Sequence, residues 1–176
     1  MKSLKIIILL GVIMILKGCS LSITDYAETK PSLDLKDYFT GSIKAWGIVQ
    51  DRKGKITRRF DVSMNGSWDG DVGTLREMFN YYDGEIQERV WTIRKISENK
   101  YEGTAKDILK KATGTIQGSA MRWSYKMEVP VKQNVFTLTF DDWMFLMNDG
   151  VLINRSYLKK FGFTVAELTL FMQKQN

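Results

Sequence analysis

Histidine is absent from this sequence of 176 residues, and cysteine occurs only at Cys19. The lack of histidine excludes serine–histidine and cysteine–histidine catalysis, histidine-ligated metal sites and an axial histidine ligand on haem. A lone cysteine excludes an internal disulfide. Proline is also rare, at Pro31 and Pro130, and no segment is of low complexity. We therefore expect one folded domain without a cofactor or a metal.

The net positive charge after residue 18 is smaller than the formal value of +6 for the whole sequence. Half of the net charge of +6 comes from Lys2, Lys5 and Lys17, because the first 18 residues contain no acidic residue. No basic run is longer than a pair such as Lys110-Lys111 or Lys159-Lys160. A net charge this small, carried by dispersed residues, does not indicate a nucleic-acid partner.

A long apolar run occurs only near the N-terminus, from Ile6 to Leu16. A helix of that length rises about 16 Å, half of a hydrocarbon core of about 30 Å, so it fits a signal peptide better than a membrane span. Leu16-Lys17-Gly18-Cys19 follows and resembles the lipobox of bacterial lipoprotein precursors, although Lys17 replaces the usual small uncharged residue. In such precursors the chain is cut before the cysteine, whose thiol takes a diacylglycerol.

We therefore expect three segments: residues 1–18 as a signal peptide, 19–36 as a lipidated cysteine and tether, and 37–176 as a single β-barrel domain. Two or three acyl chains anchor a protein stably, so no spanning helix is needed. In a Gram-negative host, Ser20 after the cysteine favours the outer membrane, with the domain facing the periplasm. The alternatives are a cleaved signal peptide that leaves a free cysteine, or an uncleaved anchor.

From Tyr38 the sequence changes to short alternating segments separated by turn residues, a pattern typical of all-β proteins. We predict strands over the segments 39–49, 56–65, 74–82, 86–96, 100–107, 113–129, 134–141, 143–147, 151–157 and 163–173. The short links favour consecutive antiparallel pairing, and closure into a barrel protects the sheet edges. The predicted fold is an up-and-down antiparallel β-barrel, lipocalin-like (calycin-like). A β-sandwich is the alternative, as is a short helix over Val165 to Phe171.

Strand parity places six charged residues on apolar faces: Arg58, Glu77, Arg89, Asp107, Asp142 and Arg155. Three acids balance three arginines, and an unpaired buried charge costs several kcal/mol. We therefore predict a charge network inside the barrel, able to hold the head group of an elongated apolar ligand beside Trp91 and Trp123. A one-residue bulge reverses parity, so the alternatives are side chains that face water or a purely structural network.

Five short stretches, taken in order, resemble a family of uncharacterised proteobacterial envelope lipoproteins, domain-of-unknown-function family 3833. They are Asp83-Gly84-Glu85 with Arg89 and Trp91, Tyr101 to Asp107, Arg122 to Tyr125, Phe140 to Met144, and Asn154-Arg155 leading to Lys160-Phe161-Gly162. The resemblance runs from about Leu33 to Phe171, and Phe140 to Met144 is its most specific part. It implies an envelope lipoprotein of about this length and assigns no catalytic or binding residue.

The expected function is a periplasmic binding module that holds or carries a lipid or another amphipathic small molecule. Four tryptophans lie on predicted strands and are compatible with a binding site, although packing in the core explains their presence more simply. They are Trp46, Trp91, Trp123 and Trp143. The alternative is a structural or assembly lipoprotein that docks onto another envelope component, with Trp68 or Tyr82 as contacts.

An enzyme is not expected. Asp141-Asp142 is the only adjacent carboxylate pair, and neighbours on a strand point to opposite faces, where they cannot share a proton. Asp69-Gly70-Asp71 and Asn148-Asp149-Gly150 do not continue into the acidic spacing of a calcium loop and are predicted to be turns.

Overall fold

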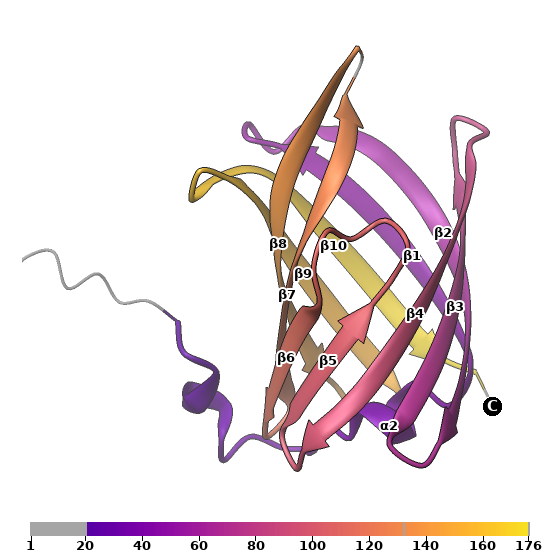
Figure 1. Ribbon diagram of the computed structural model, residues 1–176, viewed down its shortest axis with the longest axis vertical. Helices are drawn as coiled ribbons and strands as arrows, with labels where there is room; N and C mark the ends of the chain where they lie inside the picture. Colours follow the sequence, from indigo (N-terminus) through magenta and orange to yellow (C-terminus); the bar gives the residue numbers. More distant parts are fainter. Residues whose placement is uncertain (1–20, 132, 176) are drawn as a thin grey trace, which may run out of the picture.

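A computed structural model describes residues 21–131 and 133–175, which form ten strands in a closed barrel (Figure 1). The predicted signal peptide and Cys19 lie outside these residues. Two short helical segments precede the barrel, η1 (Ile23–Tyr26) and α2 (Leu35–Tyr38). The strands are β1 (Gly41–Asp51), β2 (Ile56–Asp69), β3 (Val72–Tyr81), β4 (Ile86–Ser97), β5 (Lys100–Thr104), β6 (Ala112–Gln117), β7 (Ala120–Val131), β8 (Asn134–Leu146), β9 (Val151–Lys160) and β10 (Phe163–Lys174).

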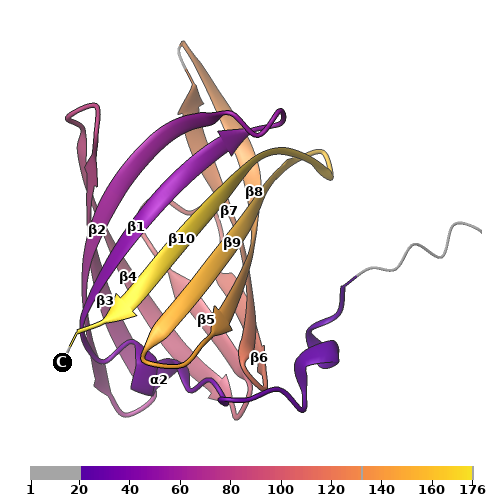
Figure 2. The same ribbon diagram turned by 180° about the vertical axis from the view of Figure 1, so that it is seen from behind.

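Each strand pairs antiparallel with its neighbour in the chain, and β1 pairs with β10 to close the ring (Figure 2). The predicted up-and-down barrel is therefore confirmed. The sandwich alternative is wrong, and so is the helix alternative for Val165 to Phe171, which lies within β10. The barrel has two strands more than the eight of a typical lipocalin.

The predicted strand over 100–107 ends at Thr104, and two other parts of the prediction differ from the structure in the number of strands. The segment 113–129 is two strands, β6 and β7, because the chain turns at Gly118, whose φ of 52° suits glycine. The segments 134–141 and 143–147 are one strand, β8. Its adjacent carboxylates do not break it, because Asp141 points outward to Arg122 and Lys159 while Asp142 points inward.

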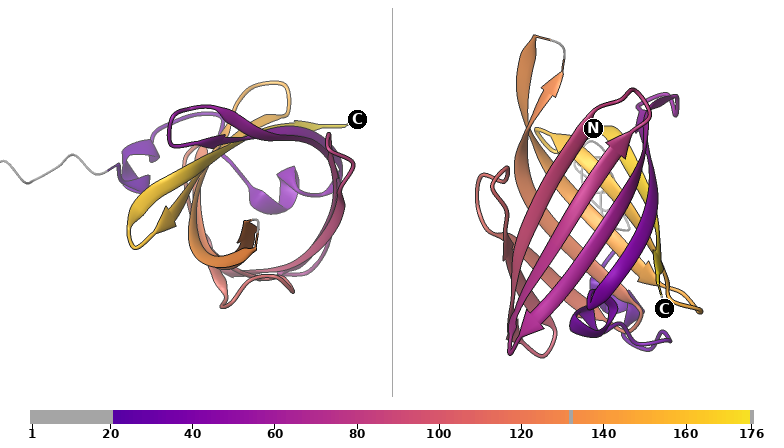
Figure 3. Two further views of the ribbon diagram at one scale, coloured as in Figure 1. Left: turned by 90° about the horizontal axis from the view of Figure 1, so that it is seen from above. Right: turned by 90° about the vertical axis from the view of Figure 1, so that its right-hand side faces the viewer.

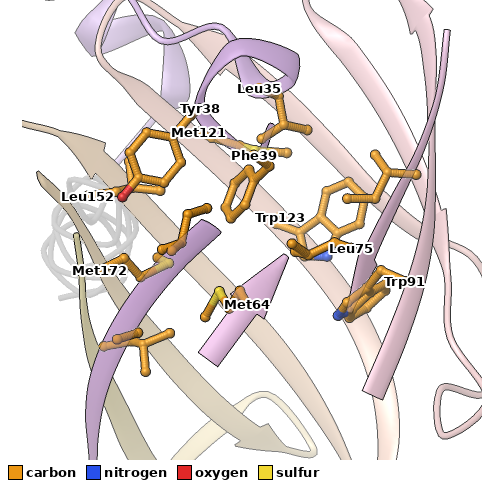
Figure 4. Packing of buried hydrophobic residues seen from close by; sticks show 14 of the residues in the cluster. Leu35, Tyr38, Phe39, Met64, Leu75, Trp91, Met121, Trp123, Leu152 and Met172 are labelled. Carbon is orange, nitrogen blue, oxygen red and sulfur yellow. The ribbon is translucent and has the colours of Figure 1, made fainter. Parts of the chain in front are cut away.

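The helix α2 closes one end of the barrel. Looking along the barrel, α2 lies within the outline of the ring, whereas η1 lies outside it (Figure 3). The side chains of Leu35 and Phe39 are buried against Met64, Leu75 and other apolar residues of the interior (Figure 4). This contact requires glycine at position 66, because a Cβ there would lie 1.7 Å from the Phe39 carbonyl oxygen.

The last residues of the segment 19–36 pack with the barrel. Leu33 and Leu35 lie within this segment, and both are buried in the core. The Leu33 amide also donates to the Gly118 carbonyl oxygen at the closed end, over 2.8 Å. Two apolar residues are too few to produce a periodic pattern. The sequence therefore did not predict that Leu33 and Leu35 are buried.

The segment η1 packs on the outer face of the barrel. Tyr26 contacts the rings of Trp143 and Phe145, with centroids 6.0 and 5.3 Å away. Close by, the Thr29 hydroxyl accepts a hydrogen bond from the Ser119 amide at 2.9 Å. The chain thus enters the domain beside the end that α2 closes. No helix within residues 21–131 and 133–175 is long and apolar enough to cross a membrane.

Candidate functional site

The barrel interior holds two neighbouring cavities. The larger, about 770 Å³, reaches the end opposite α2 and is lined there by residues of the strand ends, including Val49, Tyr81 and Lys160. The smaller, about 110 Å³, lies toward α2 and is lined by Leu35, Trp123 and other residues. Five residues belong to the walls of both: Phe60, Phe79, Arg89, Tyr125 and Leu168. This layer of side chains marks the boundary between the two.

Arg89 of β4 is the central charge of this layer. Its Nη2 lies 2.7 Å from Asp107 Oδ2, its Nε donates to the same oxygen at 2.9 Å, and its Nη2 also contacts Met127 Sδ at 3.2 Å. Nη1 lies 3.9 Å from Glu77 Oε2, because Glu77 of β3 faces Arg89 directly in the antiparallel register. The side chain is only 12% exposed; Asp107 and Met127 accept hydrogen bonds from Nε and Nη2, and Glu77 forms a longer ion pair with Nη1.

Glu77 is buried between Arg89 and Trp91. Its Oε2 accepts a hydrogen bond from Trp91 Nε1 at 3.2 Å. Burial raises the pKa of Glu77 to about 7, although Arg89 and the Trp91 N–H both oppose this change. Loss of hydration therefore outweighs the two favourable partners.

Asp142 of β8 lies across the lumen on a different wall. It faces Ser156 of β9 in the register, and Asn154 Nδ2 donates to Ser156 Oγ at 3.1 Å. Burial raises the pKa of Asp142 to about 7, while a hydrogen bond from Ser156 and the charge of Arg89 act in the other direction. Among the described residues no cation lies within ion-pair distance of this carboxylate.

Three acceptor oxygens of this interior have no hydrogen-bond partner among the described residues. They are Asp107 Oδ1, Asp142 Oδ1 and Asn154 Oδ1. The side chains of Asp142 and Asn154 line the smaller cavity, and each of these two residues is only 5% exposed. Since buried polar groups are normally paired, unpaired oxygens beside a cavity indicate a place for a donor.

Aromatic rings form the wall next to these oxygens. Trp91 meets Trp123 and Tyr125 edge to face, with centroids 5.8 and 5.3 Å apart. Trp123 lies directly opposite Asp142 in the β7–β8 register. Burial holds the pKa of Tyr125 well above its usual value, so its hydroxyl is uncharged at neutral pH. The small cavity therefore combines apolar aromatic walls with a few acceptors.

Four of the six predicted charges meet in the interior: Glu77, Arg89, Asp107 and Asp142. Trp91 and Trp123 lie beside them. Strand parity accounts for Glu77, Arg89 and Asp142, whereas Asp107 lies in the loop after β5 and reaches the interior from there. Arg58 lies apart, at the open end. There it stacks on the Tyr81 ring at 3.6 Å and bonds Asp83 and Glu85 at 2.9 Å each.

Arg155 was predicted in the interior, and this was wrong. Its side chain is 53% exposed on the outer face, where it pairs with Glu167 at 2.7 Å. Arg155 does share a face with Val151 and Ile153, but that face points outward. Apolar residues on both faces of β9 made the inward face ambiguous.

The sequence analysis missed the polar residues of β9. Leu152, Asn154, Ser156 and Leu158 alternate along the strand and are all buried. This period-two alternation was readable, but it identifies no partner for Asn154 or Ser156 until the pairing with β8 is known.

Trp46, Trp143 and the acidic turns lie away from the interior, whereas Trp68 is partly buried against the hydrophobic core. Trp46 is partly exposed beside Phe171, Trp143 is covered by Tyr26, and Trp68 packs over Gly73. Residues 69–71 and 148–150 lie at the turns between β2 and β3 and between β8 and β9. Within the described part of the chain, no group of three acidic, cysteine or histidine residues is placed to hold a metal ion.

A family model described as "Protein of unknown function (DUF3833)" matches residues 13–174, which confirms the resemblance drawn from the short stretches above. No protein of the curated collection matches the chain.

Proposed function

This chain belongs to the DUF3833 family, whose function is unknown, and from that premise we propose that it binds or carries a lipid or another amphipathic small molecule in the bacterial envelope. The observation that carries the proposal is the cavity of about 770 Å³ at the open end. Pockets for small molecules typically measure about 300–1,000 Å³ and have mostly apolar walls with a few polar groups.

The polarity of the walls of the larger cavity suits an amphipathic ligand. Apolar side chains of β8 and β10 line it, among them Phe136, Leu138 and Val165. Charged groups sit at its two ends, Arg89 at the inner boundary and Lys160 at the mouth. A molecule with an apolar body would remove these apolar walls from water, which is favourable by about 25 cal/mol per Å².

Residues ahead of the barrel support an envelope location. The apolar stretch and lipobox-like Leu16 to Cys19 are expected to direct export and lipidation. The family match begins at residue 13 and so includes Cys19. In a Gram-negative host we propose an outer-membrane lipoprotein with the barrel in the periplasm. Metabolic labelling with palmitate is expected to mark the full chain and not Cys19→Ser; equal labelling of both would contradict lipidation.

The binding proposal is tested by native mass spectrometry. All strands and the helix that closes the barrel lie within residues 35–174, so residues 20–176 contain the whole barrel. This chain, purified from a periplasm, is expected to carry a lipid-sized adduct. Val129→Trp places a large ring in the larger cavity, whereas Thr137→Trp lies on the exposed outer face of the adjacent strand.

The adduct is expected to persist in Thr137→Trp and to disappear in Val129→Trp. An adduct of equal abundance in both variants would mean that the molecule binds outside the cavity. A clean mass without any adduct in the unmodified chain, across growth conditions, would contradict the carrier proposal.

One observation favours a second proposal, an assembly lipoprotein that docks onto another envelope component. The turn between β9 and β10 presents Phe161 and Phe163, which are 89% and 76% exposed. Large apolar side chains at an exposed tip are typical of contact sites. Crosslinking from position 161 in intact cells is expected to capture a partner protein if docking is the function, and to capture none if the barrel only carries a ligand.

A further inference from the structure

The charges inside the barrel are unbalanced. Among the described residues, three carboxylates face the interior around a single arginine: Glu77, Asp107 and Asp142 around Arg89. Arg58 does not correct this, because Asp83 and Glu85 already pair with it at the mouth. The interior therefore attracts a positive charge rather than a negative one.

The unpaired hydrogen-bonding atoms of the interior have the same preference. Asp142 Oδ1 and Asn154 Oδ1 are both acceptors, and Ser156 links their two side chains. Arg89 donates from Nε to Asp107 and from Nη2 to Met127, and its Nη1 faces the Glu77 carboxylate at 3.9 Å as an ion pair. Among the described residues, the one unpaired buried side-chain donor is Arg58 Nε, which lies at the mouth. An incoming group is thus offered acceptors and few donors.

We propose that the smaller cavity binds the protonated amino group of an amphipathic amine, which donates N–H bonds to the Asp142 and Asn154 oxygens. This assigns a ligand class to the proposed carrier function and rests on it. Trp91 and Trp123 line the same cavity, and tryptophan rings favour a nearby cation as well. The apolar body of the ligand then extends past the shared layer into the larger cavity.

The size of the cavity agrees with such a head group. A volume of about 110 Å³ corresponds to three or four water molecules at about 30 Å³ each, which is enough for an ammonium group and its first methylene groups. A carboxylate or phosphate head group would meet the uncompensated Asp142 carboxylate instead. Two negative charges repel strongly in a buried site, because little water is present to screen them.

The test uses three ligands with the same twelve-carbon chain: dodecylamine, dodecanol and dodecanoic acid. Residues 20–176 are titrated with each, below its solubility limit or micelle concentration, at pH 8, where Asp142, with a pKa of about 7, is mostly ionised. Calorimetry measures affinity, and quenching of tryptophan fluorescence reports on the cavity. We expect dodecylamine to bind at least tenfold more tightly than dodecanol, and dodecanoic acid to bind most weakly.

Asp142→Asn removes the charge and keeps the shape of the side chain. It is expected to abolish the preference for the amine over the alcohol. Asp141→Asn is the matched control, because Asp141 is the next residue and points outward to Arg122 and Lys159; the preference is expected to remain. Asn154→Ala, which removes the other unpaired oxygen, provides a second variant and should weaken amine binding at least threefold.

Two outcomes overturn the inference and leave the carrier proposal standing. One is tighter binding of dodecanoic acid than of dodecylamine, and the other is an unchanged amine preference in Asp142→Asn and Asn154→Ala. If none of the three ligands binds to the unmodified protein, so that water alone fills the cavity, the inference fails together with the carrier proposal.

Discussion

The Asp142→Asn substitution is expected to make the unliganded protein more stable at alkaline pH. Burial raises the pKa of Asp142 from 3.8 to about 7, because no cation within the described residues pairs with its carboxylate. Ionisation of the Asp142 carboxyl therefore costs more free energy in the folded protein than in the unfolded chain, where water solvates the charge. Asparagine has nearly the same shape and carries no charge at any pH.

The magnitude follows from the change in pKa. Between pH 4 and 7 the unfolded chain has released this proton while the folded chain retains it. The free energy of unfolding thus falls by about 1.4 kcal/mol per pH unit over about three units, a total of about 4 kcal/mol. The loss is complete above pH 7 and absent below pH 4. Allowing for structural relaxation and water entry, we expect Asp142→Asn to be about 2–4 kcal/mol more stable at pH 8.

Urea denaturation at pH 4, 6 and 8 measures this difference. Glu77, whose pKa is also raised to about 7, lowers the stability of both proteins over the same range, so the difference between them isolates Asp142. At pH 4 both side chains are uncharged and the two proteins should agree within about 0.5 kcal/mol. Equal stability at pH 8, or a less stable Asp142→Asn, would refute the reasoning and mean that Asp142 is well paired in the folded protein.

Three further predictions, the first with a control substitution, test other parts of the structure by denaturation and proteolysis. Arg89→Leu leaves two interior carboxylates without their partner and should cost about 3–5 kcal/mol at pH 8, whereas the exposed Arg155→Gln should cost less than about 1 kcal/mol; equal losses would contradict the interior network. Gly66→Ala forces a Cβ against the Phe39 carbonyl oxygen and should lower the free energy of unfolding by about 1–3 kcal/mol. Proteolysis of residues 33–39 should become faster. Unchanged proteolysis would mean that the closed end of the barrel tolerates the methyl group. Phe161→Asn suits the positive φ of 52° at this turn and should stabilise by about 1 kcal/mol, and a loss of stability would show that the ring contributes to folding.

The sequence predicted the barrel and most of its interior charges because alternation is a local property. Glu77 lies between Leu75 and Phe79 on its face of the strand, so parity alone places it inside. The same reasoning failed at Arg155, where Val151 and Ile153 make the outer face apolar as well. Parity shows which residues share a face, and only the sheet curvature decides which face is inside.

The closed end and the unpaired oxygens depend on contacts distant in sequence. Leu35 reaches the core because Gly66, far along the chain, leaves room for the backbone at Phe39. Asn154 and Asp142 come together only through the pairing of β8 with β9. Neither relation leaves a periodic signal within one segment.

Closure of the ring by β1 and β10 has a consequence for how the protein forms. Ile43 pairs with Lys174 and Asp51 with Ala166, so this seam joins the first strand to the last. Every other ladder links strands adjacent in the chain and can form while synthesis or export is under way. The seam cannot form until β10 has emerged, and its long loop makes it the slowest pairing to establish. Until then the apolar lumen is open along its whole length, and the edge of β1 is available to other chains.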